Sequence, residues 1–351
     1  TIGDRTISGL VVRDQMVGPW QTPVADCAVT ASGFEYFVGE AMALGERPTV
    51  AVIDAPASGR LAIAEAITNI CAAPILRLSD IALSANWMAA CGEPGEDARL
   101  FDTVTAVSTL AQALGIPIPV GKDSLSMKTA WQEQGKARRV IAPVSVNITA
   151  FAPVADTRRV LTPQLQPGEG SRLLLVDLGR GRNRLGGSAL AQVFRLSGGP
   201  GADLDDAGLL AAFFQGMQLL NQSELMLAYH DRADGGLLAT ACEMAFAGRC
   251  GMSLDLPGTG SDLLPFLFNE EPGALLQLRP GQEQAALAAL IGLGLPEDTL
   301  VDLGTINLSK TLDLRVAGRS MYSRDIMELH RIWSRTTYHM QALRDNPACA
   351  R

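Results

Sequence analysis

The sequence predicts an α/β protein (α+β) built from two domains, and three observations support this. Its 351 residues exceed the usual size of one hydrophobic core. Short β-rich runs alternate with helical patterns in both halves. The stretch TPQLQPGEGS at 162–171 is rich in Pro, Gly and polar residues, which is typical of a linker. We therefore expect one sheet-centred domain over residues 1–155 and a second domain that begins after the linker.

The first half is expected to contain five strands and two helices. Helix 58–73 is the best supported, because Leu61, Ile63, Ala64, Ile67 and Ile70 recur at helical spacing and Ser58 is placed as an N-cap. The other helix, 96–114, follows the turn-forming loop CGEPGED. The expected strands are 21–31, 49–55, 75–84, 116–127 and 138–152.

The second half again mixes strands and helices. A strand at 172–179 opens it, and a Gly-containing helix start at 234–248 follows the strand 225–231. Tyr322–Ala350 has a helical pattern that carries Trp333, and Pro347 is expected to end it. The remaining expected elements are helices near 187–197 and 206–222 and a strand-rich region at 274–316.

Composition and charge restrict the classes of partner. The formal net charge is -8, from 29 Lys+Arg and 37 Asp+Glu, without basic blocks. Nucleic acid and anionic membranes are therefore not expected as main partners, whereas backbone N–H groups and magnesium can still bind small phosphates. No membrane span, signal peptide or CxxC pair occurs, so we expect a cytoplasmic protein whose six cysteines are free thiols.

Four oxygen-bearing side chains are candidates for a magnesium site. Glu65 and Asn69 lie four residues apart on the expected helix and project from one face. Asp26 and Asp231 each follow an expected strand, where α/β folds expose functional groups. Magnesium prefers such oxygen ligands. From spacing alone, a solvated Glu65, a helix-capping Asn69 and turn-capping aspartates are the favoured interpretation.

Three further segments are candidate sites. In HDRADGGLL, the pair Gly235 and Gly236 precedes an apolar helix and lets backbone N–H groups approach a phosphate, although a tight turn explains it equally well. In VGKDS, Lys122 offers a charge for phosphate or is simply solvated. The acidic run NEE at 269–271 is expected to be an exposed turn. With three histidines and no GxSxG or HExxH pattern, neither a hydrolase triad nor a zinc site is supported.

Long strings of the sequence resemble one enzyme family. GDRTISGLVVRDQMVGPWQTPVADCAVT, GEAMALGERP, AEAITNI, LSANWMAACGEPGEDARLFD, PVGKDSLSMKT, AYHDRADGGLL, LFNEE and LRDNP are similar to the second synthetase repeat of the large, single-chain phosphoribosylformylglycinamidine synthases. The resemblance implies an aminoimidazole ribonucleotide (AIR) synthetase-like repeat, in which an N-terminal α/β domain forms a barrel with its counterpart and a C-terminal α/β domain follows. The implied bounds are 1–155, a linker at 156–171, 172–320, and a helical segment at 321–351 that leads toward a glutaminase domain.

The same resemblance implies the site residues. Asp26, Glu65, Asn69 and Asp231 fall on the family's magnesium ligands, and Ala25 and Ala233 fall on positions that touch the nucleotide. Relatives have Ser at the position of Ala233, so a hydroxyl contact is not expected there. With Lys122, Gly235 and Gly236 from the patterns above, these residues make up the expected Mg2+ and ATP/ADP site, and no catalytic residue is assigned.

The family's reaction converts formylglycinamide ribonucleotide, glutamine and ATP to formylglycinamidine ribonucleotide, glutamate, ADP and phosphate in purine biosynthesis. The start at Thr1 leads us to expect an internal portion of a longer enzyme, whose first repeat and glutaminase domain are its partners. Without them the chain is expected to be incomplete in activity and to self-associate as a homodimer. The alternative is a structural half that holds a tightly bound ADP. A kinase or selenophosphate-synthetase-like activity would need a catalytic Cys or Sec that the sequence does not indicate.

Overall fold

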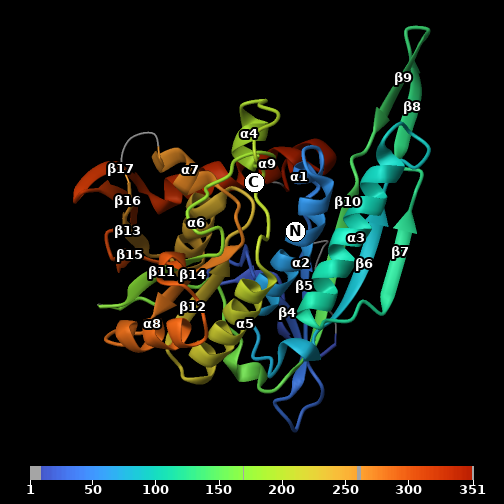
Figure 1. Ribbon diagram of the computed structural model, residues 1–351. Coiled ribbons are helices and arrows are strands. Elements are labelled where there is room, and N and C mark those ends of the chain that lie inside the picture. The colour runs from blue at the N-terminus through green and yellow to red at the C-terminus, as the bar shows by residue number, and fades with distance from the viewer. Residues whose placement is uncertain (1–8, 169, 259–261, 350–351) are drawn as a thin grey trace.

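The computed structural model describes residues 9–168, 170–258 and 262–349 (Figure 1). The first eight residues of the expected first domain, residue 169 of the expected linker and the last two residues of the chain lie outside this part. Two large sheets lie on opposite sides of the molecule, with helices between them (Figure 1). Among the described helices, none has both the length and the apolar run that crossing a bilayer requires.

The first sheet is open and has six strands in the order β1-β4-β5-β10-β6-β7. Helices α2 and α3 pack on one face, where Ala41, Ala43, Ile148 and Ala150 are buried with them. The sheet does not close into a barrel on its own, since β1 and β7 remain its two edges. Its strands are β1 Val11–Arg13, β4 Ala28–Ala31, β5 Gly39–Gly45, β6 Ala82–Met88, β7 Val120–Ser124 and β10 Ser145–Val154. Its helices are α1 Pro48–Ala51, α2 Ala55–Ile70 and α3 Glu96–Leu114.

Smaller elements complete the first half. The strands β2 Met16–Val17 and β3 Thr22–Pro23 form a two-stranded ribbon. A second ribbon, β8 Lys128–Glu133 with β9 Lys136–Ile141, projects away from the body of the protein (Figure 1). Two 3-10 turns are also present, at Leu78–Asp80 and Thr157–Arg159.

The second sheet has seven strands in the order β12-β14-β11-β15-β13-β16-β17 and is covered on both faces. Alternate residues of β11 show this, because Leu174 is buried with the α5 core and Leu173 with the α6 core. Its strands are β11 Arg172–Asp177, β12 Met226–Asp231, β13 Gly251–Asp255, β14 Gly273–Leu278, β15 Leu300–Asn307, β16 Thr311–Val316 and β17 Arg319–Asp325. The helices are α4 Ala189–Val193, α5 Ala207–Gln222, α6 Gly236–Gly248, α7 Leu263–Phe268, α8 Glu283–Gly292 and α9 Ile326–Arg344, and a 3-10 turn lies at Glu297–Thr299.

The strand expected at 49–55 and the N-cap expected at Ser58 are both wrong. Residues 49–55 do not form a strand, because Pro48 begins the short helix α1 and Asp54 caps α2, its Oδ1 accepting from Ala57 N at 2.9 Å. Ser58 is therefore not the N-cap but an internal residue whose hydroxyl donates to the Ala55 carbonyl. The β-rich strand of this region is instead β5, which precedes the expected position.

Other boundaries shift for local reasons. The expected strand 21–31 is split into β3 and β4 around Asp26, and 138–152 is split between β9 and β10. The region 274–316 also contains α8, which sequence patterns missed. The helix expected from Tyr322 begins only at Ile326, because residues 319–325 pair with β16 and Asp325 caps the helix. It ends at Arg344, two residues before the Asn-Pro pair. All six cysteines are free thiols, as expected.

Gly45 allows β5 to lie directly against α2. A Cβ at this position would stand 2.1 Å from the Ala62 carbonyl oxygen and 2.5 Å from the Ala66 nitrogen, and both belong to the backbone of α2. This close approach brings the end of β5 against the turn of α2 that carries Glu65.

We predict that Gly45→Ala lowers the free energy of unfolding by more than ~2 kcal/mol, because helix and strand must move apart. Gly33→Ala is the matched control, since no atom of the described residues, its chain neighbours aside, lies within 4 Å of a Cβ built there. Urea unfolding of both variants measures the difference. Equal stability of the two variants would contradict the packing described here.

Candidate functional site

Asp26 lies at the junction of the two halves, between β3 and β4. Its Oδ1 accepts hydrogen bonds from the backbone N–H of Asp231, at 2.9 Å, and from Nδ1 of His230, at 2.8 Å. Its Oδ2 is buried and has no partner within the described structure. A buried carboxylate oxygen without a partner is costly, so this atom is suited to bind a cation or a water molecule.

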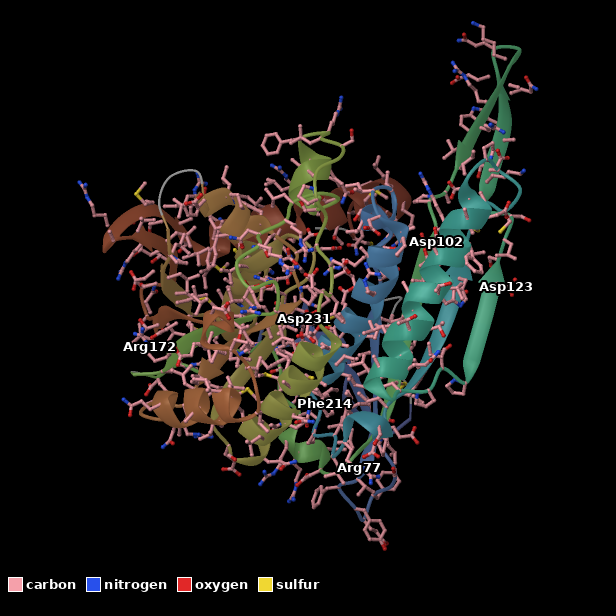
Figure 2. The ribbon with its side chains drawn as sticks, viewed as in Figure 1. Arg77, Asp102, Asp123, Arg172, Phe214 and Asp231 are labelled. Atoms are coloured by element: carbon pink, nitrogen blue, oxygen red, sulfur yellow. The ribbon has the colours of Figure 1, made fainter. Side chains whose placement is uncertain are left out.

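Asp231 ends β12 and lies beside Asp26. Ligand atoms of Asp26, His230 and Asp231 all fall within 4.8 Å of one another. Thr68 of α2 donates its hydroxyl to Asp231 Oδ2 at 3.3 Å, and Tyr229 donates to the Thr68 carbonyl at 2.5 Å. Asp231 lies at the centre of the molecule in Figure 2. The structure therefore brings together the two aspartates that the sequence places 205 positions apart.

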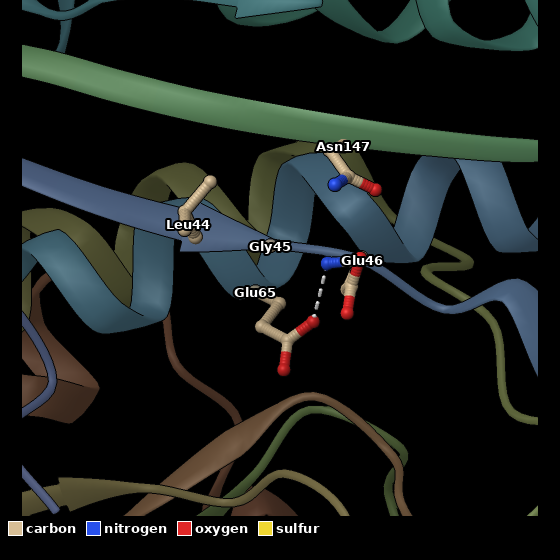
Figure 3. A pocket seen from close by; sticks show the side chains of 5 residues that line it. All are labelled: Leu44, Gly45, Glu46, Glu65 and Asn147. Atoms are coloured by element: carbon tan, nitrogen blue, oxygen red, sulfur yellow. Dashed lines mark hydrogen bonds between the residues drawn. The ribbon is translucent and has the colours of Figure 1, made fainter. Parts of the chain in front are cut away.

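Glu65 and Asn69 both face the end of β5, as their spacing predicts. Glu65 Oε2 accepts from the Glu46 N–H at 2.8 Å (Figure 3), and Asn69 donates its amide to the Leu44 carbonyl at 3.0 Å. Glu65 also lines a hollow of about 220 Å³ with Leu44, Gly45, Glu46 and Asn147 (Figure 3). Glu65 is close enough to Asp231 to raise the pKa of that aspartate.

Arg47 is a member of this site that the sequence reasoning missed. It is only 4% exposed, and its guanidinium contacts carboxylates from both halves. Glu65 lies at 3.4 Å, Glu270 lies at 3.8 Å, and Asp234 forms a short hydrogen bond with Nη1. Arg47 could be seen in the sequence as the single cationic residue of the GERP string. Nothing in its position along the chain connects Arg47 to Asp234 or Glu270.

Negative charge exceeds positive charge in this cluster. Burial raises the pKa of Asp231, and the carboxylates of Asp26 and Glu65 raise it further. Burial likewise raises the pKa of Glu65 against the opposing effect of Arg47. Six carboxylates, those of Asp26, Glu65, Asp231, Asp234, Glu243 and Glu270, share the cationic side chains of Arg47 and His230. Crowded carboxylates of this kind favour a bound cation.

His230 links the cluster to the C-terminal helix. Its Nε2 lies 3.0 Å from Glu243 Oε2, and Trp333 of α9 donates to Glu243 Oε1 at 2.9 Å. Burial lowers the pKa of His230, but Asp26 and Glu243 outweigh burial and leave that pKa well above its ordinary value. A cationic imidazole between two carboxylates fixes the orientation of Asp26.

The predicted nucleotide residues at the glycine turn lie beside this cluster. Gly235 and Gly236 have φ of 85° and 66°, so the tight-turn interpretation describes both. Their N–H groups donate to Glu270 Oε1 and to the Ala233 carbonyl, respectively. A Cβ on Gly236 would meet the Asn269 carbonyl at 2.5 Å. Ala25 is half-buried, and its N–H donates to the Gln15 carbonyl.

Lys122 is not brought to this cluster. It lies on the edge strand β7, where its ammonium group is 3.4 Å from the Ser124 hydroxyl. The adjacent Asp123 is drawn at the outer edge of the first sheet, well separated from Asp231 (Figure 2). Within the described fold, Lys122 shares no surface with Asp231.

The expectation of an exposed turn at Asn269–Glu271 is wrong. Asn269 and Glu271 are fully buried and Glu270 is 3% exposed. Glu271 pairs with Arg184 at 2.7 Å, and Glu270 accepts from the N–H groups of Ala189 and Gly235 at 2.8 Å each. The acidic run is therefore an internal support for the glycine turn rather than a solvated loop.

The donor set fits magnesium. It consists of carboxylate oxygens, and Asp26 Oδ2 has no other partner within the described residues. The amide nitrogen of Asn69 bonds to Leu44, which places this amide at the same end of β5 as Glu65. The fit therefore rests on the carboxylates of Asp26 and Asp231, whose ligand atoms lie within 4.8 Å of each other and of His230, and on the unsatisfied oxygen.

Two family descriptions match parts of this chain. Residues 1–153 match the FGAR-AT PurM_N-like domain, and residues 168–316 match the C-terminal domain of AIR synthase-related proteins.

Solved structures share this fold at low identity. Thermotoga maritima PurL complexed with ATP is similar over 90% of this chain and 47% of its own, with 10% identity and a TM-score of 0.61. The same protein complexed with FGAR gives 13% identity, 90% and 49% coverage and a TM-score of 0.61. Escherichia coli HypE gives 19% identity, 82% and 84% coverage and a TM-score of 0.54. This chain spans about half the length of the PurL chains. The chain thus has the AIR synthase-like fold, with an FGAR-AT PurM_N-like domain followed by an AIR synthase-related C-terminal domain.

Proposed function

We propose that this chain binds ATP or ADP through Mg2+ held by Asp26, Glu65 and Asp231, with Asn69 as the fourth ligand. The unsatisfied, buried Oδ2 of Asp26 beside two further carboxylates carries this proposal. Bound magnesium would spread the charge of the nucleotide's phosphates. Ala25, Ala233 and the glycine turn flank the cluster and are proposed to touch the nucleotide through their backbone.

The proposed reaction is that of a phosphoribosylformylglycinamidine synthase, of which this chain is the second synthetase repeat. The amide oxygen of formylglycinamide ribonucleotide takes the γ-phosphoryl group of ATP, which releases ADP. Ammonia from glutamine then adds to the activated carbon, and phosphate leaves with that oxygen to give the amidine. Two findings support this reaction: the description of the matched N-terminal domain, and the fold shared with PurL structures that contain ATP and FGAR.

The contribution of this chain's own residues is positional. His230 and the Asp231 N–H hold Asp26, and Thr68 holds Asp231, so the carboxylates are fixed before a ligand arrives. The site lies between the two domains, where burial excludes water and strengthens each electrostatic contact. No residue is proposed as a nucleophile or as a general base.

The partners are proposed to be a related synthetase repeat and a glutaminase domain that supplies ammonia. The face of the first sheet opposite α2 supports the first of these. Leu44 and Phe151 are 58% and 42% exposed on this face, beside Met42 and Thr149 in the strand register. An apolar sheet face of this kind is suited to pack against a second domain, or against a copy of itself in a homodimer.

A purely structural nucleotide site is the second candidate. Burial favours it, since Asp26 is 8% and Asp231 is 3% exposed, and ligands held at such depth leave slowly. Turnover by the isolated chain, supplied with ammonia, ATP and formylglycinamide ribonucleotide, separates the two candidates. Product formation would refute the structural alternative.

We predict that Asp26→Asn weakens magnesium-dependent ADP binding by at least ~10-fold, because it removes a charged ligand from a buried site. Titration calorimetry at saturating magnesium measures the loss. Asp302→Asn is the matched control, since Asp302 of β15 pairs with Arg172 of β11 and is not part of the cluster. Unchanged affinity in the Asp26 variant would remove the assignment.

We also predict that pH and magnesium act in opposition on stability. The raised pKa values of Asp231 and Glu65 mean that the folded, metal-free protein binds protons that the unfolded chain releases at the same pH. This contribution to stability is complete below the ordinary carboxyl pKa of about 4 and is lost as the pH rises through the raised values. Asp231→Asn should therefore raise the Tm of the metal-free protein at about pH 8 and abolish the Tm increase caused by magnesium.

Thermal unfolding at about pH 5 and pH 8, with and without magnesium, tests this prediction. A variant that is less stable than the wild type at both values, and that still responds to magnesium, would show that Asp231 serves folding alone.

A further inference from the structure

The guanidinium of Arg47 has an unusual set of partners for a buried cation. It precedes α1, is 4% exposed, and contacts Glu65 in the first domain and Asp234 and Glu270 in the second. Among the described residues, Arg47 forms a side-chain hydrogen bond with Asp234, whereas Glu65 and Glu270 are longer ion-pair contacts at 3.4 and 3.8 Å. Arg47 thus faces several carboxylates but is firmly bound to one.

That one partner is the most exposed member of the cluster. Asp234 is 85% exposed and belongs to the turn that precedes Gly235. A buried guanidinium with five donors normally holds its partners in a fixed, two-pronged geometry. Here the short contact is made with the exposed side chain of Asp234. An anion that enters from solvent can therefore replace the Asp234 carboxylate at Arg47 without disturbing the core.

Glu65 is also free to change partners. Its Oε2 is fixed by the Glu46 N–H at 2.8 Å, whereas the contact of Oε1 among the described side chains is the 3.4 Å ion pair with Arg47. A cation that binds Oε1 would replace this longer contact and leave the other in place. A cation that binds Glu65 Oε1 therefore takes the place of the Arg47 guanidinium at that oxygen.

We propose that Arg47 is a phosphate-binding residue: when magnesium takes Glu65, the guanidinium gives up Glu65 and Asp234 and pairs with the phosphate chain of a nucleoside di- or triphosphate. This inference rests on the proposed magnesium-nucleotide site and deepens it. Planar, two-pronged pairing with phosphate is the interaction for which arginine is suited. Until the ligand arrives, Arg47 keeps the cluster of carboxylates from repelling one another.

The exchange has a consequence that a structural role lacks. Arg47 competes with free magnesium for Glu65 but contributes to binding of the phosphates. Its removal should therefore raise the affinity for magnesium alone and lower the affinity for ADP in magnesium. We expect Arg47→Met to bind magnesium alone about threefold more tightly or better and to bind ADP, at saturating magnesium, at least ~10-fold more weakly. Arg47→Lys keeps the charge and loses the planar fork, so its affinity for ADP should fall by about threefold or more.

Calorimetric titration with magnesium chloride alone, and with ADP in magnesium, measures both affinities. Arg60→Met is the matched control: it removes the same charge and an ion pair between the two halves, with Asp203, but lies outside the cluster. Both affinities should be unchanged in that control. Asp234→Ala provides a second measurement, in which ADP should bind at least as tightly as it does to the wild type because a competing carboxylate is gone.

If both affinities of Arg47→Met move in the same direction, or if Arg47→Lys binds ADP like the wild type, the proposal is overturned. Should Arg47→Met fail to fold, Arg47→Lys and Asp234→Ala still test the proposal. ADP binding by Asp234→Ala that is weaker than that of the wild type would also overturn the proposal. A wild-type protein that binds no ADP in magnesium would instead refute the proposed function.

Discussion

One carboxylate oxygen joins the two halves of this protein at the point on which the site depends. Asp26 Oδ1, from the first half, accepts from the His230 side chain and from the Asp231 N–H, both at the end of β12 in the second half. The same two bonds leave Oδ2 buried without a partner in the described structure. The interaction that fixes the domain junction therefore also creates the oxygen most in need of a cation.

The neighbouring contacts show why the junction is polar rather than apolar. Tyr229 bonds to the Thr68 carbonyl, Thr68 bonds to Asp231, and Arg47 faces carboxylates of both halves. Buried polar groups contribute little net stability over an apolar interface, but they specify one arrangement of the two domains. A site whose ligands come from both domains needs that arrangement to be unique.

The sequence predicted features set by local periodicity better than contacts between distant residues. Helix 96–114 was predicted to the residue, and spacing correctly placed Glu65 and Asn69 on one face, because both depend on local periodicity. The strand expected at 49–55 failed where Pro48 and Asp54 outweighed β-branched propensity. The clustering of Arg47 with Asp234 and the burial of Asn269–Glu271 depend on contacts across many residues, which no local pattern encodes. The position of Lys122 on the edge strand β7 likewise depends on strand order, which no local pattern encodes.

The C-terminal helix α9 is hydrogen-bonded, through Glu243 and His230, to the candidate site. Trp333 donates to Glu243, Glu243 contacts His230, and His230 holds Asp26 Oδ1. Hydrogen bonds therefore run without a break from α9 to the carboxylate that carries the unsatisfied Oδ2. Around Trp333, ring contacts of His330 with Trp20 and Phe246 hold α9 against α6 and the ribbon that precedes Asp26. Ile326 is the buried residue of α9, and Leu329 and Trp333 pack partly buried against the core cluster that contains Phe246. The residues that anchor the helix are thus the residues that orient the site, and the position of α9 and the geometry of Asp26 are set by the same contacts.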